Sequence, residues 1–409
     1  MDEHGPVEGS AEDQRDAEHQ HAHLHPAVGR RPVTSARKTA AIASAMVAVV
    51  LGTTSCTTTK EPEPQRQFAL SPAPPSFTEG DDYTVESRIP TVLDGQQVVY
   101  FDRTDGRLIM SLSGTSKSGQ PSEDDPRGGA LISVDPKTNE VTELARHGKP
   151  GAPRYIVDVA VAGKTVVWVE TTQGNYDAMP WRLYALNLET GVEKELASYQ
   201  QLGIKDPPWP SPDAIRPQVV GDDVYVVAVD RVDDQQNVVQ TSAYRVPLTG
   251  GKLEKVVPKA TGAWAAGREL DVLVDSTLTR WDPDRGSSGE ATGAGLPADC
   301  GAFAAKGVRV ACTTADGRRR LTVESTEHGR FTVDLGRNTV GYLNGTSDWV
   351  SFSTGDRAFV LDLRRGKLFS LPGSNDTGTS RLSGRSFIYV KQTSSPDAMR
   401  LVTLADKDR

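Results

Sequence analysis

The chain has 409 residues, of which 46 are basic and 54 are acidic, giving a net charge of −8. This balance disfavours the concentrated basic surface of a nucleic-acid-binding protein, so no nucleic acid is expected as a partner. Only 6% of the residues are aromatic, whereas Gly (38) and Pro (26) are plentiful, which is typical of many short strands joined by turns.

Residues 1–38 are predicted to be a disordered, polar tail ending in a basic segment, because they lack the apolar periodicity that a core requires. Histidines alternate from His19 to His25, and imidazole is a common metal ligand. Alternating histidines on an unstructured tail bind metals weakly, so no physiological metal site is predicted. Val33 is an alternative to Met1 as the start of translation, and its use would leave this histidine-rich segment unmade.

Residues 39–56 are predicted to be an export signal. The uncharged run from Thr39 to Gly52 follows basic residues and precedes small ones, and it is shorter than the roughly 20 residues of a transmembrane helix. Cys56 occupies the position of the lipidated cysteine in a lipoprotein signal, although Thr53 replaces the usual Leu. We therefore predict lipidation of Cys56 and a domain at the outer face of the cytoplasmic membrane. An uncleaved anchor and ordinary secretion are the alternatives.

Residues 57–82 are rich in Thr, Pro and Ser and are predicted to be a flexible tether to a domain at residues 83–409. In that domain a turn followed by alternating β-branched and aromatic residues recurs seven times, as in GKTVVWVE and GRSFIYVK. The later repeats converge on about 40 residues, the size of a four-stranded propeller blade. The turn glycines are Gly95, Gly163, Gly221, Gly267, Gly307, Gly345 and Gly384.

The predicted fold class is all-β, a seven-bladed β-propeller of four-stranded antiparallel blades. Four strands, A to D, can be followed most clearly in the second unit, where LETG marks the C-to-D hairpin turn. The seventh unit offers only three strands before the chain ends. We expect its fourth strand to come from residues 83–89 (YTVESRI), because this would close the ring and remove two open sheet edges.

These repeats, with phrases such as LYALNLETGVEKEL, resemble the TolB-like and related bacterial periplasmic β-propellers. The resemblance covers residues 83–405 and is one of pattern, since the SPDG turn common in that family is replaced by AGKT, VGDD or SGR. It implies the propeller fold and a binding or scaffolding role. A quinone-dependent dehydrogenase propeller is disfavoured because the regularly repeated tryptophans of that class are missing.

Two cysteines lie in the fifth unit, on the A and B strands of one predicted hairpin. Cys300 and Cys312 are equidistant from the turn at residue 306, so they would face each other across the ladder. Export to an oxidising compartment favours a disulfide between them over two buried thiols. A metal site there is disfavoured because no other Cys or His lies nearby in sequence.

The search for catalytic residues gives no candidate. His147 and His328 are interpreted as turn histidines on separate units, and no phosphate-binding glycine motif or cofactor motif is present, so no cofactor is predicted. The carboxylates form no recognisable acid pair or calcium loop, and most are interpreted as turn formers. They include Asp94, Asp158, Asp222, Asp223, Asp230, Asp271, Asp275 and Asp362.

Long connections gather in units one to three. They lie at about 103–129, in TTQGNYDAMPW, in QLGIKDPPWPSPD and in DRVDDQQNVVQ, all of them B-to-C or D-to-A connections that leave a blade at the same face. Tyr176, Trp181 and Trp209 lie in these loops and are candidate binding residues, because aromatic side chains often anchor partners. The alternative is that the tryptophans only cover a blade edge.

The predicted function is protein or peptide binding at the cell envelope by a non-catalytic, membrane-tethered propeller. One alternative is a hydrolase or lyase that acts on a sugar or small ester in the central channel. Another is an accessory or sensor subunit of a membrane complex.

Overall fold

The computed structural model describes residues 66–114, 128–149, 152–172, 179–205, 207–208, 215–293, 302–305, 307–315, 317–340, 343–355, 357–371, 381–383, 386–390 and 398–404. Among these residues no helix is both long and apolar enough to cross a membrane. Cys56, Tyr176, Trp209 and Cys300 lie outside the described residues.

The described part of the chain is all-β, apart from one 3₁₀ turn, η1 (Tyr199–Leu202), and its strands form seven small sheets. We number the sheets along the chain. The first contains β3 (Val92–Leu93), β4 (Gln96–Thr104), β5 (Arg107–Gly114), β6 (Ala130–Val134) and β7 (Val141–Ala145). The second contains β8 (Tyr155–Ala162), β9 (Thr165–Thr171), β10 (Arg182–Asn187) and β11 (Glu193–Ser198). The third contains β12 (Gln218–Val220), β13 (Asp223–Val232), β14 (Val238–Pro247) and β15 (Glu254–Pro258).

The remaining sheets are also antiparallel, apart from the parallel pairing of β1 at the edge of the fifth. The fourth contains β16 (Ala260–Ala266), β17 (Glu269–Val274), β18 (Thr277–Asp282) and β19 (Ser287–Gly293). The fifth contains β20 (Ala302–Ala305), β21 (Val308–Ala315), β22 (Arg318–Ser325), β23 (Gly329–Gly336) and, at its edge, β1 (Arg66–Ala69). The sixth contains β24 (Leu343–Gly345), β25 (Trp349–Thr354), β26 (Arg357–Asp362) and β27 (Lys367–Ser370). The seventh contains β28 (Arg381–Ser383), β29 (Ser386–Val390), β30 (Ala398–Leu404) and β2 (Tyr83–Pro90).

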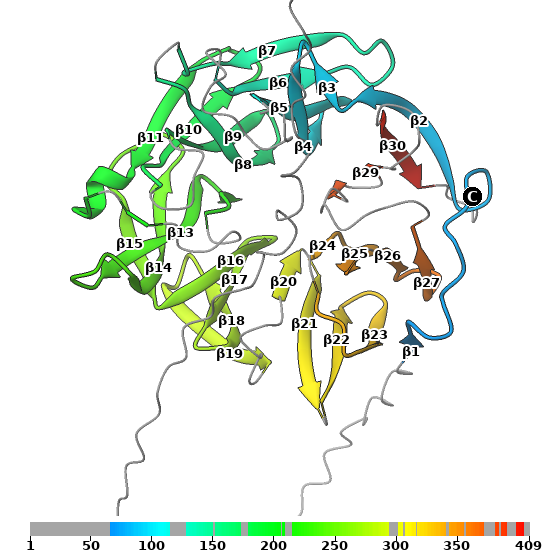
Figure 1. Cartoon of the computed structure of the whole chain (residues 1–409). Coiled ribbons are helices and arrows are strands. Elements are labelled where there is room, and N and C mark those ends of the chain that lie inside the picture. Colours follow the sequence, from blue (N-terminus) through cyan, green and yellow to red (C-terminus); the bar gives the residue numbers. More distant parts are fainter. Residues whose placement is uncertain are drawn as a thin grey trace, which may run out of the picture. The chain divides into compact units, whose positions relative to one another are not determined.

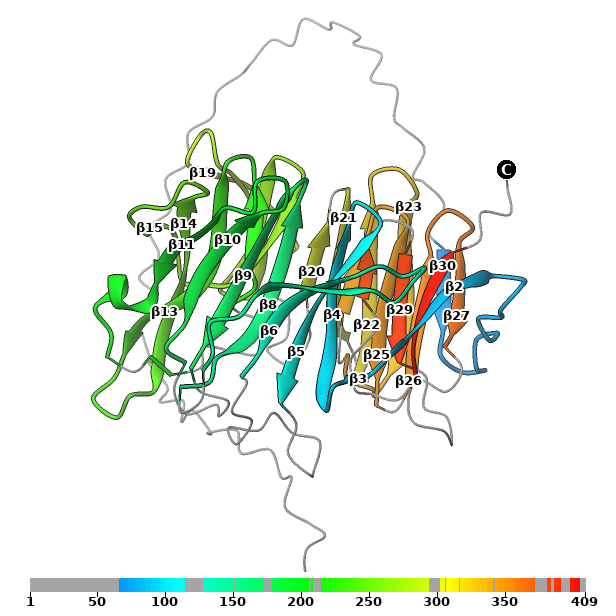
Figure 2. The same ribbon diagram turned by 90° about the horizontal axis from the view of Figure 1, so that it is seen from above.

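The sheets have a propeller arrangement (Figure 1). Their inner strands are neighbours in chain order, from β4 through β8, β12, β16, β20 and β24 to β28, and β28 lies next to β4. Figure 2 shows the strands running from one face of this arrangement to the other. Apolar side chains fill the spaces between adjacent sheets, such as the cluster of Val166, Trp168 and Phe101 between the first two. Each sheet is therefore stabilised mainly by its two neighbours.

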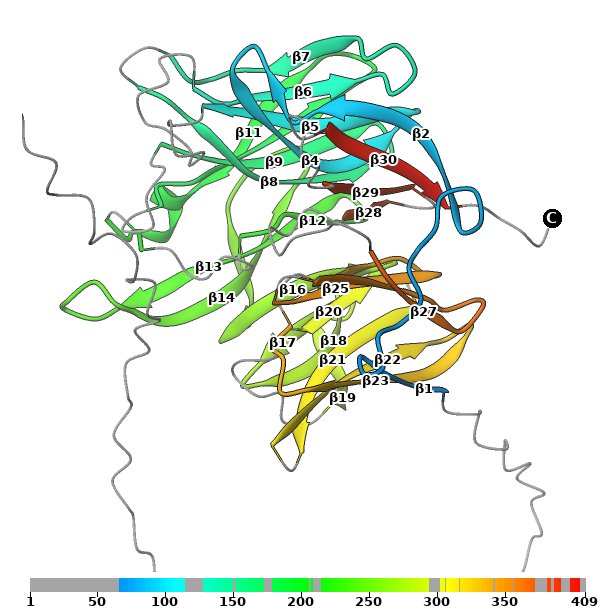
Figure 3. The ribbon, with the colours of Figure 1, turned by 45° about the vertical axis from the view of Figure 1, so that its right-hand side comes forward.

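Strand β2 closes the seventh sheet, as the sequence predicts. It pairs antiparallel with β30, and the register runs from Tyr83 opposite Leu404 to Pro90 opposite Ala398 (Figure 3). Glu86 adds a polar link, because it accepts hydrogen bonds from the Thr403 hydroxyl at 2.9 Å and from both terminal nitrogens of Arg103 at 2.8 Å. Strand β2 thus joins the seventh sheet to the first.

The prediction of a flexible tether is wrong for residues 66–82. Strand β1 pairs in parallel with β23, Ser76 bridges to Ser370 of β27, and Phe77 is fully buried against Trp349 and Phe369. We call residues 66–82 the N-terminal strap, since they contact the fifth and sixth sheets before β2 enters the seventh (Figure 3). Pairing with an exposed sheet edge satisfies the backbone hydrogen-bonding groups of the strap. The composition of the segment does not predict this pairing.

The first unit also differs from its predicted strand order. The segment around 103–129 was expected to be one long loop, but residues 107–114 form β5 between β4 and β6. The strand that follows Gly95 is therefore an inner strand, equivalent to β8 rather than to β9. The predicted turns at Gly163 and Gly191 are confirmed, with positive φ values of 58° and 67°, which glycine adopts without steric cost. Gly345, in contrast, is the last residue of β24, and Gly384 lies outside the described residues.

Candidate functional site

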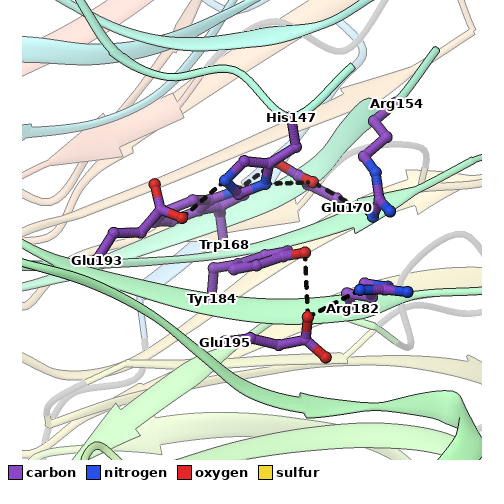
Figure 4. Close-up of polar contacts among 8 residues, drawn as sticks. All are labelled: His147, Arg154, Trp168, Glu170, Arg182, Tyr184, Glu193 and Glu195. Carbon is purple, nitrogen blue, oxygen red and sulfur yellow. Dashed lines mark hydrogen bonds and ion pairs between the residues drawn. The ribbon is translucent and has the colours of Figure 1, made fainter. Parts of the chain in front are cut away.

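A polar cluster lies between the first and second sheets (Figure 4). Its side chains come from the link between β7 and β8 and from the three outer strands of the second sheet. The link belongs to the face from which the β5–β6, β9–β10 and β13–β14 connections also leave, which we call the loop face. The members of the cluster are His147, Arg154, Trp168, Glu170, Arg182, Tyr184, Glu193 and Glu195.

His147 is held between two carboxylates. Its Nδ1 lies 2.9 Å from Glu170 Oε2, and its Nε2 lies 2.7 Å from Glu193 Oε1. The hydrogen bond to Glu170, together with the charges of both carboxylates, raises the pKa of His147 above its ordinary value. Each ring nitrogen thus faces a carboxylate oxygen, and both can donate a hydrogen bond when the ring is protonated.

Glu170 is the buried centre of the cluster, with 1% of its surface exposed. Besides His147, it accepts a hydrogen bond of 2.9 Å from the indole of Trp168, and its Oε2 lies 3.9 Å from Arg154 Nη1. A buried carboxylate needs such partners because its desolvation is unfavourable. The arrangement makes His147 a connector from the link after the first sheet to the interior of the second.

Aromatic rings enclose this pair. Trp168 stacks on Tyr184 with ring centroids 5.4 Å apart, and the His147 ring lies 4.4 Å from that of Tyr184. The Tyr184 hydroxyl donates to Glu195 at 3.3 Å, and burial raises the pKa of Tyr184. Arg182 completes this side with an ion pair of 2.9 Å to Glu195. The cluster is thus polar at its edge and packed at its centre.

Backbone groups at the loop face also have hydrogen-bond partners. The Gly128 carbonyl accepts hydrogen bonds from buried Gln96 at 2.8 Å and from Arg146 at 3.2 Å. The Gly129 N–H donates to the Arg154 carbonyl at 2.6 Å. A Cβ at Gly129 would lie 2.8 Å from that carbonyl oxygen, so only glycine allows this close approach. The connection between β5 and β6 therefore returns to the sheet at a fixed position.

Trp181, a candidate binding residue with blade-edge covering as its alternative, is buried with 1% exposure. It packs with Met179 and Ile215 in the core between the second and third sheets. The Met179 N–H also donates to the Pro207 carbonyl at 2.7 Å, which joins the β9–β10 connection to the β11–β12 link. Trp181 offers no exposed surface to a partner and instead fixes the base of two long connections.

The Nε2 of His328 lies 3.0 Å from Asp348 Oδ1, and Glu327 Oε2 lies 4.0 Å from the same ring nitrogen. These three groups could in principle ligate a cation, since their ligand atoms lie within 4.8 Å of one another. Glu327 is exposed, and three ligands are fewer than a structural zinc site takes from protein. We interpret His328 and Asp348 as a link between the fifth and sixth sheets.

Cys312 lies on β21 and is fully buried. The described ladder pairs Ala302 with Ala311 and Ala305 with Val308. This register differs by one residue from the predicted one, which would place position 300 opposite Cys312. The pairing of the two cysteines stays a prediction.

Several features of the cluster were missed in the sequence. The His147–Glu170 pair joins the link between β7 and β8 to the second sheet, and the signal for it was a charged residue directly after the apolar run VVWV. Three of the acidic residues interpreted as turn formers, Asp158, Asp271 and Asp362, are buried in strands. Asp94 and Asp275 do lie in turns, with positive φ.

Comparison with known proteins supports the fold alone. No family model and no curated protein matches the chain. Among solved structures, a prolyl endopeptidase matches with 12% identity and a TM-score of 0.50, over 77% of this chain and 51% of its own. The β-propeller domain of the trilobed protease from Pyrococcus furiosus matches with 9% identity and a TM-score of 0.46, over 76% and 99%. A puromycin-hydrolysing peptidase from Mycobacterium tuberculosis matches with 13% identity and a TM-score of 0.45, over 80% and 55%.

The chain spans about half the length of the prolyl endopeptidase and of the mycobacterial peptidase. At these identities the likeness concerns the propeller fold and carries no activity to this chain. Among the described residues, neither imidazole is hydrogen-bonded to a hydroxyl or thiol.

Proposed function

We propose that the protein is a non-catalytic, envelope-located propeller that binds a protein or peptide through the loop face of its first three sheets. The observation that carries the proposal is the construction of that face. Gly128 and Gly129 fix one connection, and Trp181 and Met179 fix two others through buried contacts. Loops held by a rigid scaffold bind with a smaller entropic cost than free ones.

We further propose that each of the seven sheets is one blade and that the family is TolB-like. The cycle of neighbouring inner strands and the pairing of β2 with β30 support the blade count. The resemblance of the repeats in sequence supports the family. A crystal or cryo-EM structure of residues 66–409 tests both, and a ring with any other number of blades would contradict the first.

The cellular location follows from the proposed signal. We propose lipidation at Cys56, a domain at the outer face of the cytoplasmic membrane, and a disulfide between Cys300 and Cys312. Intact-mass analysis of protein from the membrane fraction should show a diacylglyceryl group on an N-terminal Cys56. Alkylation should label Cys312 only after reduction. Labelling of Cys312 in unfolded, unreduced protein would exclude the disulfide.

Affinity capture tests the binding function. The bait is the lipidated protein, compared with a Tyr176→Ala/Trp209→Ala double variant and with a variant whose residues 115–127 are replaced by a short Gly-Ser linker. Trp181 is left intact because its removal would create a core cavity. Val192→Ser, at a turn on the opposite face where Val192 is 64% exposed, is the matched control.

A partner captured by the wild type and by the control, but lost from both loop variants, supports the proposal. Each bait must show the same thermal unfolding midpoint as the wild type. A partner retained equally by the loop variants would place the binding surface elsewhere and reject the loop face.

A further inference from the structure

A pocket of about 300 Å³ lies between the N-terminal strap and the fifth and sixth sheets. Its volume is at the lower end of the range for sites that take small molecules. It lies in a different part of the chain from the His147 cluster and shares no residue with it. The lining residues are Ala69, Leu70 and Ser71 from the strap, Arg318, Asp334, Leu335, Gly336 and Asn338 from the fifth sheet and the residues after it, and Thr354, Gly355, Arg357 and Phe359 from the sixth.

Two arginines and one carboxylate determine the charge of this lining. Asp334 accepts a hydrogen bond from the Gly336 N–H at 2.9 Å and pairs with Arg318 at 2.5 Å. The backbone hydrogen bond first, and the Arg318 charge next, lower the pKa of Asp334, so the carboxylate stays ionised near neutral pH. Arg318 is therefore neutralised by Asp334, and Arg357 is the positive charge left over in the described lining.

Arg357 is held in place without a carboxylate partner among the described residues. Its guanidinium carbon lies 5.1 Å from the ring centroid of Phe359, which is fully buried. Stacking on an aromatic face orients the planar guanidinium while leaving its N–H donors available. Such a donor set matches a carboxylate or phosphate group in a bidentate arrangement.

The rest of the lining completes a site for the organic part of a ligand. Leu70 and Leu335 supply apolar surface, and Asn338 and Thr354 supply polar atoms. The Asn338 amide nitrogen donates to the Leu335 carbonyl at 2.9 Å, which fixes the orientation of its side chain. A pocket with an apolar part, a few placed polar groups and one uncompensated cation is suited to a small organic anion.

We propose that this pocket binds a small organic carboxylate or phosphate, with Arg357 as the principal anchor of the anionic group and Arg318 as a second donor. Because Ala69, Leu70 and Ser71 form one wall, an occupant contacts the N-terminal strap and the body of the propeller together. Binding therefore also stabilises the contact of the strap with the fifth and sixth sheets.

Isothermal titration calorimetry of the full chain, with three probes, tests the proposal. Phenyl phosphate and benzoate carry the two candidate anionic groups, and benzyl alcohol has the same ring without a charge. We expect saturable binding of at least one anion, at least about tenfold tighter than that of benzyl alcohol, because the charged hydrogen bonds are lost with the alcohol. The stronger of the two anions identifies the ligand class.

Variants at exposed positions locate the site. Arg357→Ala should weaken binding of the preferred anion by about tenfold or more, and Arg357→Lys should restore only part of it, since lysine keeps the charge without the planar donor pair. Arg330→Ala is the matched control, because Arg330 is a similarly exposed arginine of the fifth sheet outside the pocket. Equal affinity for benzyl alcohol, unchanged affinity in Arg357→Ala, or no saturation by about 10 mM would each overturn the proposal.

Discussion

His147 shows how a histidine with two carboxylate partners contributes to stability. In the folded protein its pKa is raised, chiefly by the hydrogen bond to Glu170, whereas in the unfolded chain it returns to about 6.5. A raised folded-state pKa gives a contribution that is complete below the unfolded-state pKa. It is lost as the pH rises through the folded-state value.

We therefore expect the stability difference between the wild type and His147→Gln to be largest below the unfolded-state pKa of about 6.5 and to shrink as the pH rises through the raised folded-state pKa of His147. Urea unfolding of both proteins at several pH values measures this difference. NMR titration of the His147 ring should give a midpoint above 6.5. A difference that stays constant or grows with pH would contradict the doubly paired imidazolium.

Asp271 is a buried carboxylate that joins two sheets. It is fully buried on β17 and forms two hydrogen bonds with Arg280 of its own sheet, at 2.9 and 3.0 Å. It forms two more with Arg309 of the fifth sheet, both at 3.1 Å. Bidentate contacts on both sides satisfy the acceptor sites of the carboxylate.

Replacing Asp271 with Asn removes the charge that both arginines share. We expect the free energy of unfolding to fall by about 2 to 4 kcal/mol, as for a buried pair that loses one partner. Asp275→Asn is the control, because Asp275 lies in an exposed turn at positive φ that Asn also tolerates, and it should change stability by about 0.5 kcal/mol or less. Equal effects in the two variants, measured by urea unfolding, would refute the link between the sheets.

At the scale of single residues, the sequence predicted local backbone conformation better than it predicted the burial and contacts of side chains. The turn glycines follow from local backbone conformation, so Gly163 and Gly191 could be predicted. The environments of Trp181 and Asp271 could not, because they depend on segments far away in the chain. A tryptophan in a Pro-containing connection has the same local sequence whether it is exposed or covered.

At the scale of elements, the N-terminal strap is the main difference from the sequence prediction. Its only strand, β1, has four residues in a Pro-rich context, which gives no period that could be recognised. Phe77 is the apolar residue that holds it, with ring centroids 4.9 Å from Tyr83 and 5.2 Å from Phe369.

Phe77→Ala should lower the free energy of unfolding by about 3 to 5 kcal/mol, because it removes a fully buried ring and leaves a cavity. Phe68→Ala, in the same strap, should have a smaller effect because Phe68 is only partly buried. Chemical denaturation of the three proteins compares them. If the strap were only a flexible tether, neither variant would lower the free energy of unfolding.

The strand predictions were better for later units than for the first. Near-regular spacing of about 40 residues identifies strands by position, whereas the spacing of 68 from Gly95 to Gly163 contains one more strand than a unit. The hairpin after Gly95 resembles the others locally, so nothing in its own sequence shows that it begins at the inner strand.

At the scale of the whole molecule, β2 determines whether the arrangement is closed. It pairs with β30 and contributes Ile89 to the core between the seventh and first sheets. Residues 75–409, which retain Phe77 and β2, should fold. Residues 91–409 should lose cooperative unfolding, because two sheet edges and apolar surface become exposed.

Circular dichroism and urea unfolding of the two fragments test this expectation. A synthetic peptide of residues 73–92 should restore a cooperative transition to residues 91–409 if the missing strand is the cause. An unaltered transition midpoint in the shorter fragment would show that β2 is not required.

The pairing of β2 with β30 also determines the order in which the strands of the seventh sheet can form during synthesis. Glu86 and Thr403 are 317 positions apart. At synthesis rates of roughly 5 to 20 residues per second, β2 waits on the order of 15 to 60 s for its partner strand. During that interval it presents an unpaired edge that can join other chains. Each chain must therefore complete β30 before β2 is protected, so a frameshift or nonsense codon upstream of β30 should yield aggregation rather than a slightly shortened domain.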